Sequence, residues 1–146
     1  MQHDKAKKIL LIEDSATWRT LIAALFPDWR LTIAPDFNTA IDCLQARDDF
    51  DCIITDLILP DSPPEETVDR LRQLWDGPLV VLTSAPESSN HSTVVVDKSL
   101  IQEGRVLRLA VSAAVEENNV SKMFARMKPR GLYAGALQIA IAACLR

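Results

Sequence analysis

Short apolar runs alternate along this chain with stretches in which apolar residues recur at helical spacing. The runs lie at 9–12, 31–33, 52–55, 79–82 and 94–96. Each has the continuous apolar character of a strand that is covered on both faces of a parallel sheet. After the first run, Trp18, Leu21, Ile22 and Leu25 lie at i, i+3, i+4 and i+7, which predicts a helix that ends near Pro27.

The same helical spacing returns in three later stretches. They are Phe37, Ala40, Ile41 and Leu44; Val68, Leu71 and Trp75; and Leu107, Ala110, Val111 and Ala114. The third helix should end before Gly77-Pro78, and the last should run from about 100 to 118. Strands that alternate with helices predict an α/β fold with a five-stranded parallel sheet.

The connection between the fourth and fifth strands is too short for an ordinary crossover helix. Only the eleven residues Thr83–Thr93 lie there, and they are rich in Ser, Pro and Asn without apolar periodicity. The fourth helix is therefore expected to be shortened or absent.

The last part of the chain, 119–146, has a different character from 6–118, which we expect to be the main domain. Val120, Met123, Phe124 and Met127 form a short amphipathic stripe. Pro129-Arg130-Gly131 interrupts it, and 132–145 is apolar nearly all round. This pattern predicts a C-terminal helical hairpin that packs on the body, on a second protomer or on a further domain.

Charge separates the same two parts. The 146 residues, about one domain in size, carry a net charge of -4. Five basic residues and no acidic one lie in 119–146, which leaves 11 basic against 20 acidic residues in 1–118. The tail cations either lie against an acidic surface or are simply solvated. No basic footprint for nucleic acid results, so direct DNA binding is not expected.

Cysteine usage and hydropathy indicate the compartment. Cys43, Cys52 and Cys144 are an odd number at wide spacing, which suits neither a disulfide framework nor a zinc site. We therefore expect a reducing, cytoplasmic location. The polar N-terminus and the length of the apolar stretches predict neither a signal peptide nor a membrane span.

Chemically active side chains gather where the predicted strands end. Glu13-Asp14 follows the first strand, Asp56 the third, Thr83 the fourth and Asp97-Lys98 the fifth. The carboxyl ends of parallel strands meet at one edge of a sheet, so these groups should converge.

Singly, these residues have ordinary explanations, such as a helix cap for Asp14 or a surface charge for Lys98. Together, three acids and one ammonium favour a site for Mg²⁺, a hard cation that prefers oxygen ligands. Such a site suits phosphoryl transfer to a carboxylate nucleophile.

The order of these residues resembles the receiver domain of two-component response regulators, the CheY-like family. The matching segments are 9–15, 54–61, 80–85 and 97–98, within roughly 6–118. The resemblance implies a flavodoxin-like, doubly wound sheet with strand order 2-1-3-4-5. It also implies a phosphoprotein of a two-component or phosphorelay system, with a sensor histidine kinase or phosphotransfer protein as phosphohistidine donor and a downstream protein partner.

The resemblance further implies a role for each residue of the cluster. Asp56 would accept the phosphoryl group, and Asp14 and Asp56 would bind Mg²⁺ directly. Glu13 would hold a metal-bound water, and the backbone carbonyl of Ile58 would complete the protein ligands. Lys98 would contact the phosphoryl group, and Thr83 would turn toward it as the switch.

Several positions depart from the family pattern. Val95 stands where an aromatic switch residue is usual, Ser99 replaces a common Pro, and Pro64 stands where a Gly often occurs. With the fourth helix lost as well, we expect signalling through a remodelled surface formed by 84–93 and the C-terminal hairpin. The tail can pack within the chain or form a homodimer through 119–146; the dimer is slightly favoured because a truncated output face exposes apolar surface.

Other functions remain open. The alternatives are a receiver-like protein-interaction module that works without phosphorylation and the N-terminal fragment of a longer regulator. A haloacid dehalogenase type of phosphatase needs an Asp two positions after its nucleophile, and Ile58 occupies that position here. We therefore expect a signalling domain and not an enzyme. Such a domain catalyses only its own phosphoryl acceptance and loss.

Overall fold

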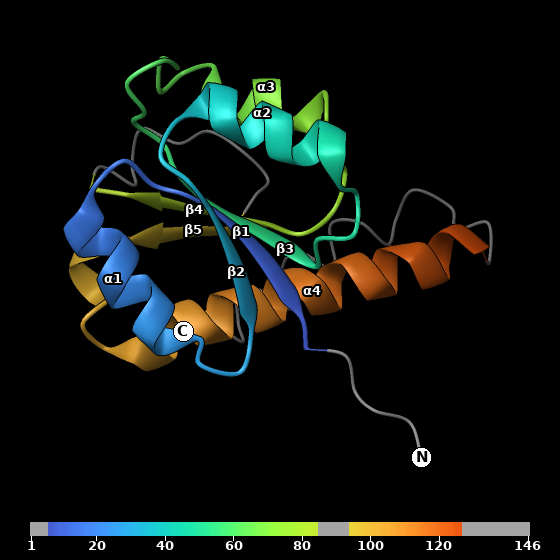
Figure 1. The fold of residues 1–146 in the computed structure, drawn as a ribbon. Coiled ribbons are helices and arrows are strands. Elements are labelled where there is room, and N and C mark those ends of the chain that lie inside the picture. Colours follow the sequence, from blue (N-terminus) through green and yellow to red (C-terminus); the bar gives the residue numbers. More distant parts are fainter. Residues whose placement is uncertain (1–5, 85–93, 127–146) are drawn as a thin grey trace.

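The computed structural model describes residues 6–84 and 94–126, and they form a five-stranded sheet whose strands are all parallel. The strands are β1 (Lys8–Ile12), β2 (Arg30–Ala34), β3 (Cys52–Asp56), β4 (Leu79–Thr83) and β5 (Val94–Asp97). Their order is β2-β1-β3-β4-β5 (Figure 1). The flavodoxin-like α/β fold expected from the sequence is confirmed.

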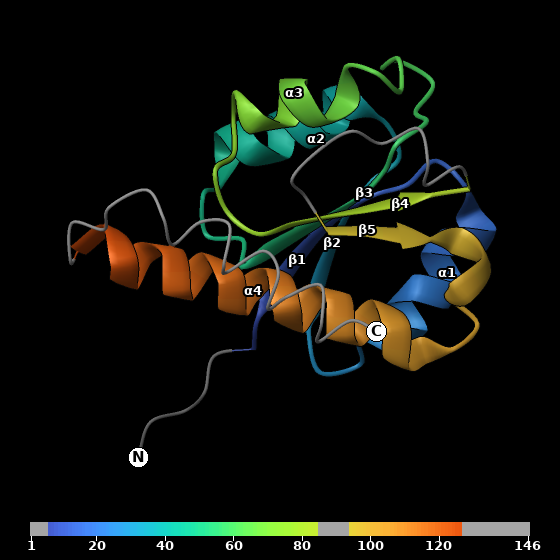
Figure 2. The ribbon, with the colours of Figure 1, turned by 180° about the vertical axis from the view of Figure 1, so that it is seen from behind.

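Helices cover both faces of the sheet. They are α1 (Ala16–Leu25), α2 (Phe37–Ala46), α3 (Thr67–Arg72), the 3₁₀ turn η2 (Lys98–Leu100) and α4 (Gly104–Arg126). Helices α2 and α3 lie on one face, and α1 and α4 lie on the other (Figures 1 and 2).

Each central strand contributes alternate side chains to two separate cores. In β1, Ile9 and Leu11 pack with the α1 and α4 side, whereas Leu10 and Ile12 pack with the α2 and α3 side. All four side chains are fully buried. This burial on both faces explains why the strands have continuous apolar sequences rather than alternating ones.

Helix α4 differs from its predicted bounds. The prediction that a helix ends at Asn118 is wrong, because α4 continues without a break to Arg126. Neither Asn118 nor Asn119 removes a backbone hydrogen-bond donor as a proline would, so the helix has no local reason to end there. The last turns of α4 extend beyond the sheet (Figures 1 and 2). The second limb of the expected hairpin, 132–145, lies outside the described residues.

Helix α3 is shorter than its apolar spacing suggests. It ends at Arg72, and the indole nitrogen of Trp75 donates to the carbonyl of Pro78, 3.1 Å away, in the connection to β4. The connection from β4 to β5, where the sequence predicts a shortened or absent fourth helix, lies at 85–93 outside the described residues. No helix in the described ranges has the length and apolarity needed to cross a membrane.

Candidate functional site

Three carboxylates come together at the carboxyl ends of β1 and β3. Glu13, Asp14 and Asp56 each place one oxygen within 4.8 Å of the others. The pairing of Ile12 with Thr55 in adjacent strands sets the following residues, Glu13 and Asp56, side by side. Glu13 and Asp56 are buried, whereas Asp14 is exposed. The structure therefore brings together the three acidic side chains that the sequence singled out.

Lys98 joins this cluster from the end of β5. Its Nζ atom lies 2.8 Å from Oδ2 of Asp56 and 3.1 Å from Oε2 of Glu13. Only 8% of Lys98 is exposed, so its ammonium faces the carboxylates with little competition from water. One cation thus compensates two buried acids.

Burial and mutual repulsion shape the protonation of the cluster. Burial, followed by the nearby Asp56 carboxylate, raises the pKa of Glu13 from 4.5 to about 7. Burial alone would lower the pKa of Lys98, but its hydrogen bond to Asp56 and its attraction to the negative charges of Asp56 and Glu13 raise it. The ammonium is therefore retained at neutral pH.

One oxygen of Glu13 has spare capacity. Oε1 accepts a hydrogen bond from the backbone N–H of Ser15 at 3.1 Å. Oε2 is buried and has no hydrogen-bond partner, because its contact with Lys98 is an ion pair without hydrogen-bond geometry. A buried acceptor left open beside two other carboxylates fits a hydrated divalent cation, whose coordinated water would donate to it.

The loop that carries the acidic pair is held by the first turns of α1. Ser15 caps the helix, with its Oγ accepting from the N–H of Trp18 at 3.4 Å. The guanidinium of Arg19 donates to the carbonyls of Glu13 and Asp14 at 3.1 and 2.9 Å. The sequence pattern alone does not single out Arg19, which lies five residues after Asp14 and six after Glu13.

A second loop leads from Asp56 toward α3. The backbone N–H of Ile58 donates to Oδ1 of Asp56 at 3.1 Å, while the Ile58 side chain is 57% exposed. Deeper in this loop, the buried Oγ1 of Thr67 lies 3.0 Å from the carbonyl of Leu57. The Asp56 carboxylate is thus oriented by the backbone on one side and by Lys98 on the other.

Thr83 ends β4 next to the cluster. Its neighbour Leu82 pairs with Asp56 across the sheet, and Thr83 itself pairs with Asp97. Thr83 is buried, with 1% exposure. Val95 stands where receiver domains usually have an aromatic switch residue. It is half-buried and packs against the core on the α2 and α3 side.

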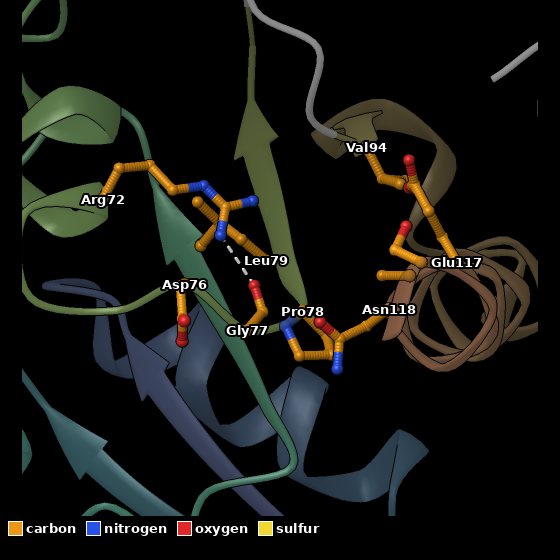
Figure 3. Close-up of a pocket in the computed structure, with 10 residues that line it drawn as sticks. Arg72, Asp76, Gly77, Pro78, Leu79, Val94, Glu117 and Asn118 are labelled. Carbon is orange, nitrogen blue, oxygen red and sulfur yellow. Dashed lines mark hydrogen bonds between the residues drawn. The ribbon is translucent and has the colours of Figure 1, made fainter. Parts of the chain in front are cut away.

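The described chain also contains a pocket of about 390 Å³ away from these residues (Figure 3). It lies where β4 and β5 begin, between the α3–β4 connection and α4, so the strands separate it from the acidic cluster. Arg72 donates there to the carbonyl of Gly77 at 2.7 Å, and Glu117 faces the same pocket (Figure 3). None of the site residues expected from the sequence lines it.

No protein-family model matches the chain, whereas a known regulatory protein is similar in sequence and solved structures are similar in fold. The transcriptional regulatory protein RstA of Escherichia coli (strain K12) is 33% identical over 85 residues, which are 57% of this chain and 35% of RstA. This chain thus matches only about a third of the length of that relative.

Solved structures share the fold over most of the chain. The signal receiver domain of an HD domain-containing protein from Pseudomonas fluorescens Pf-5 is 20% identical, with a TM-score of 0.68 over 80% of this chain and 99% of that one. The N-terminal domain of a response regulator/sensory box/GGDEF three-domain protein from Carboxydothermus hydrogenoformans is 25% identical, with a TM-score of 0.67 over 79% and 98%. The fold is that of a response regulator receiver domain.

Proposed function

We propose that this chain is a phosphorylatable receiver in two-component signalling and that Asp56 accepts a phosphoryl group from a phosphohistidine donor. The observation that carries the proposal is the geometry around Asp56. Its Oδ2 atom lies 2.8 Å from Nζ of Lys98. Its carboxylate also places an oxygen within 4.8 Å of carboxylate oxygens of Glu13 and Asp14. The donor would be a sensor histidine kinase or a phosphotransfer protein.

In the proposed reaction, an oxygen of the Asp56 carboxylate attacks the phosphorus atom of the donor. A P–O bond forms as the P–N bond to the imidazole breaks, and the imidazole leaves with its electron pair and takes up a proton. Lys98 would offset negative charge on the transferred group, and the Thr83 hydroxyl would turn toward a phosphoryl oxygen. The chain is thus a signalling domain that acts on itself, not an enzyme that turns over a separate substrate.

The same residues fit Mg²⁺. Asp14 and Asp56 would bind it directly with the backbone carbonyl of Ile58, and the open Oε2 atom of Glu13 would accept from a coordinated water. The ion would supply positive charge that offsets charge on the transferring group.

The surface that binds the downstream partner is proposed to differ from the one that receiver domains usually use. Ten residues, 84–93, connect β4 to β5, and Val95 carries no ring to couple with Thr83. The downstream protein would therefore bind this connection and the basic C-terminal extension.

We further propose that 119–146 pairs two copies of the chain. Sedimentation should give a dimer for the full chain and a monomer for a chain that ends at Asn119; two monomers would refute the pairing.

The phosphorylation proposal is tested by incubating the chain with Mg²⁺ and acetyl phosphate and measuring the intact mass. Wild type and the control variant Asp69→Asn, changed at an exposed carboxylate of α3, should each gain one phosphoryl group. Asp56→Asn should gain none. If wild type stays unmodified, the proposal fails, and a receiver-like interaction module that works without phosphorylation becomes the better explanation.

A further inference from the structure

Trp18 lies against the ammonium group that serves the site. Its ring centre is 5.2 Å from Nζ of Lys98, the atom that also contacts Asp56 and Glu13. An ammonium over an aromatic face is attracted by the ring quadrupole, most strongly for tryptophan and when water is largely excluded. Lys98 is 8% exposed, so this condition is met.

The ring is held in place from two directions. The backbone N–H of Trp18 donates to the Ser15 cap, which fixes its position in the first turn of α1. The half-buried ring packs against the core on the α1 and α4 side of the sheet. The next residue, Arg19, ties the same turn to the carbonyls of Glu13 and Asp14. One turn of α1 therefore supports both the acidic loop and Lys98.

We propose that Trp18 is a positioning residue that holds the Lys98 ammonium on the Asp56 side of the site, ready to meet a phosphoryl group. The phosphoryl part of this inference rests on the proposed function. A tryptophan suits the task because its face attracts the cation without neutralising it. Lys98 thus keeps its full charge for the carboxylates and for the incoming group, whereas an aliphatic side chain would fill the space without any attraction.

If Trp18 only filled space in the core, its removal should act like the removal of another tryptophan from the same core. Trp29 is the matched control for this comparison. Trp29 packs against the same core and also has a lysine over its ring, with Nζ of Lys7 at 5.4 Å. It differs in lying directly before β2, away from the acidic cluster. Removing either ring disturbs the same core, but only Trp18 should affect Lys98.

The first measurement is the rate of phosphoryl uptake from acetyl phosphate with Mg²⁺ in wild type, Trp18→Phe, Trp18→Leu and Trp29→Leu. Trp18→Leu should be slower by about 2- to 30-fold, the range that a cation–π contact supplies. Trp18→Phe should recover part of the rate because it keeps a ring, and Trp29→Leu should stay near wild type. Equal rates in Trp18→Leu and Trp29→Leu, or no recovery by Phe, would overturn the proposal.

The second measurement does not depend on phosphorylation. The ring current of Trp18 should shift the NMR signals of the Lys98 ε-methylene protons upfield in wild type and in Trp29→Leu, and the shift should vanish in Trp18→Leu. Unshifted signals in wild type would overturn the inference. If every chain failed to take up a phosphoryl group while the shift behaved as stated, the proposed function would fail and the hold of Trp18 on Lys98 would stand.

Discussion

The ammonium of Lys98 lies 2.8 Å from the Oδ2 atom of Asp56, although 42 residues separate them in the chain. The contact arises because β3, β4 and β5 are neighbours in the sheet and Lys98 follows the end of the third of them. The same ammonium lies 3.1 Å from Glu13, so two buried carboxylates share one cation. The cluster is therefore left with an excess of negative charge, which has consequences for stability and for ligand binding.

The first consequence concerns Asp56 itself. Replacing Asp56 by Asn removes a buried negative charge beside Glu13 while keeping an oxygen that can accept from Lys98 or from the Ile58 N–H. In the presence of EDTA, Asp56→Asn should raise the free energy of unfolding by about 1 kcal/mol. Urea denaturation measures it, with Asp69→Asn expected within about 0.5 kcal/mol of wild type. A loss of stability in Asp56→Asn would show that the paired carboxylate stabilises the fold more than repulsion destabilises it.

Mg²⁺ should stabilise the folded chain through the same cluster. A ligand that binds only the folded state, at 100 times its Kd, adds about 2.7 kcal/mol to the free energy of unfolding. Asp14→Asn should lose most of this gain because it removes one of the three carboxylates, whereas Asp69→Asn should keep it. The check is thermal or urea unfolding with and without Mg²⁺. Equal gains in wild type and Asp14→Asn would place the ion elsewhere.

Thr67 should anchor the loop that follows Asp56. Its buried Oγ1 lies 3.0 Å from the carbonyl of Leu57 and 2.9 Å from the Ser62 hydroxyl. Thr67→Val keeps the shape of the side chain but leaves the Leu57 carbonyl and the Ser62 hydroxyl without this partner. The free energy of unfolding should therefore fall by about 1–3 kcal/mol. The backbone amide of Ile58 should also exchange its hydrogen faster. Thr20→Val, which removes an exposed hydroxyl bonded to Ala16, is the control. Equal stability of the two variants would argue against the anchor.

The pH dependence of stability should include a contribution from Glu117, in the pocket at the start of β4 and β5. Burial raises its pKa above 4.5, and the nearby Arg72 only partly opposes this. A folded-state pKa above the unfolded value means that the folded chain binds the proton more tightly. The corresponding stability is complete below the unfolded pKa and is lost as pH rises through the folded one.

Glu117→Gln should therefore lack this loss. As the pH rises above 4.5, the unfolding free energy of wild type should fall relative to that of Glu117→Gln. The exposed neighbour Glu116 offers the control variant Glu116→Gln, which should follow wild type. Urea midpoints across this range make the comparison. Parallel curves for wild type and Glu117→Gln would contradict the expected role of burial.

Much of the fold and the site could be predicted because local patterns carry the relevant physics. Buried parallel strands need apolar residues on both faces, so the runs at 9–12, 52–55 and 79–82 indicated strands directly. The side chains that end such strands must share an edge of the sheet, which is why Asp56 and Lys98 could be assigned to one site before any distance was known.

Other features depended on tertiary packing. In the sequence, Trp18 belongs to an apolar helical stripe, and nothing in that spacing indicates that its ring also contacts Lys98, 80 positions further along the chain. Arg19 likewise has the sequence pattern of an ordinary helical cation, and only the structure shows that it donates to the carbonyl of Asp14 in the acidic loop. The length of α4 was misjudged because two asparagines weaken a helix without ending it. Local periodicity thus determined which residues form strands, helices and strand ends, whereas contacts between distant side chains were decided only when the sheet brought its strands and α1 together.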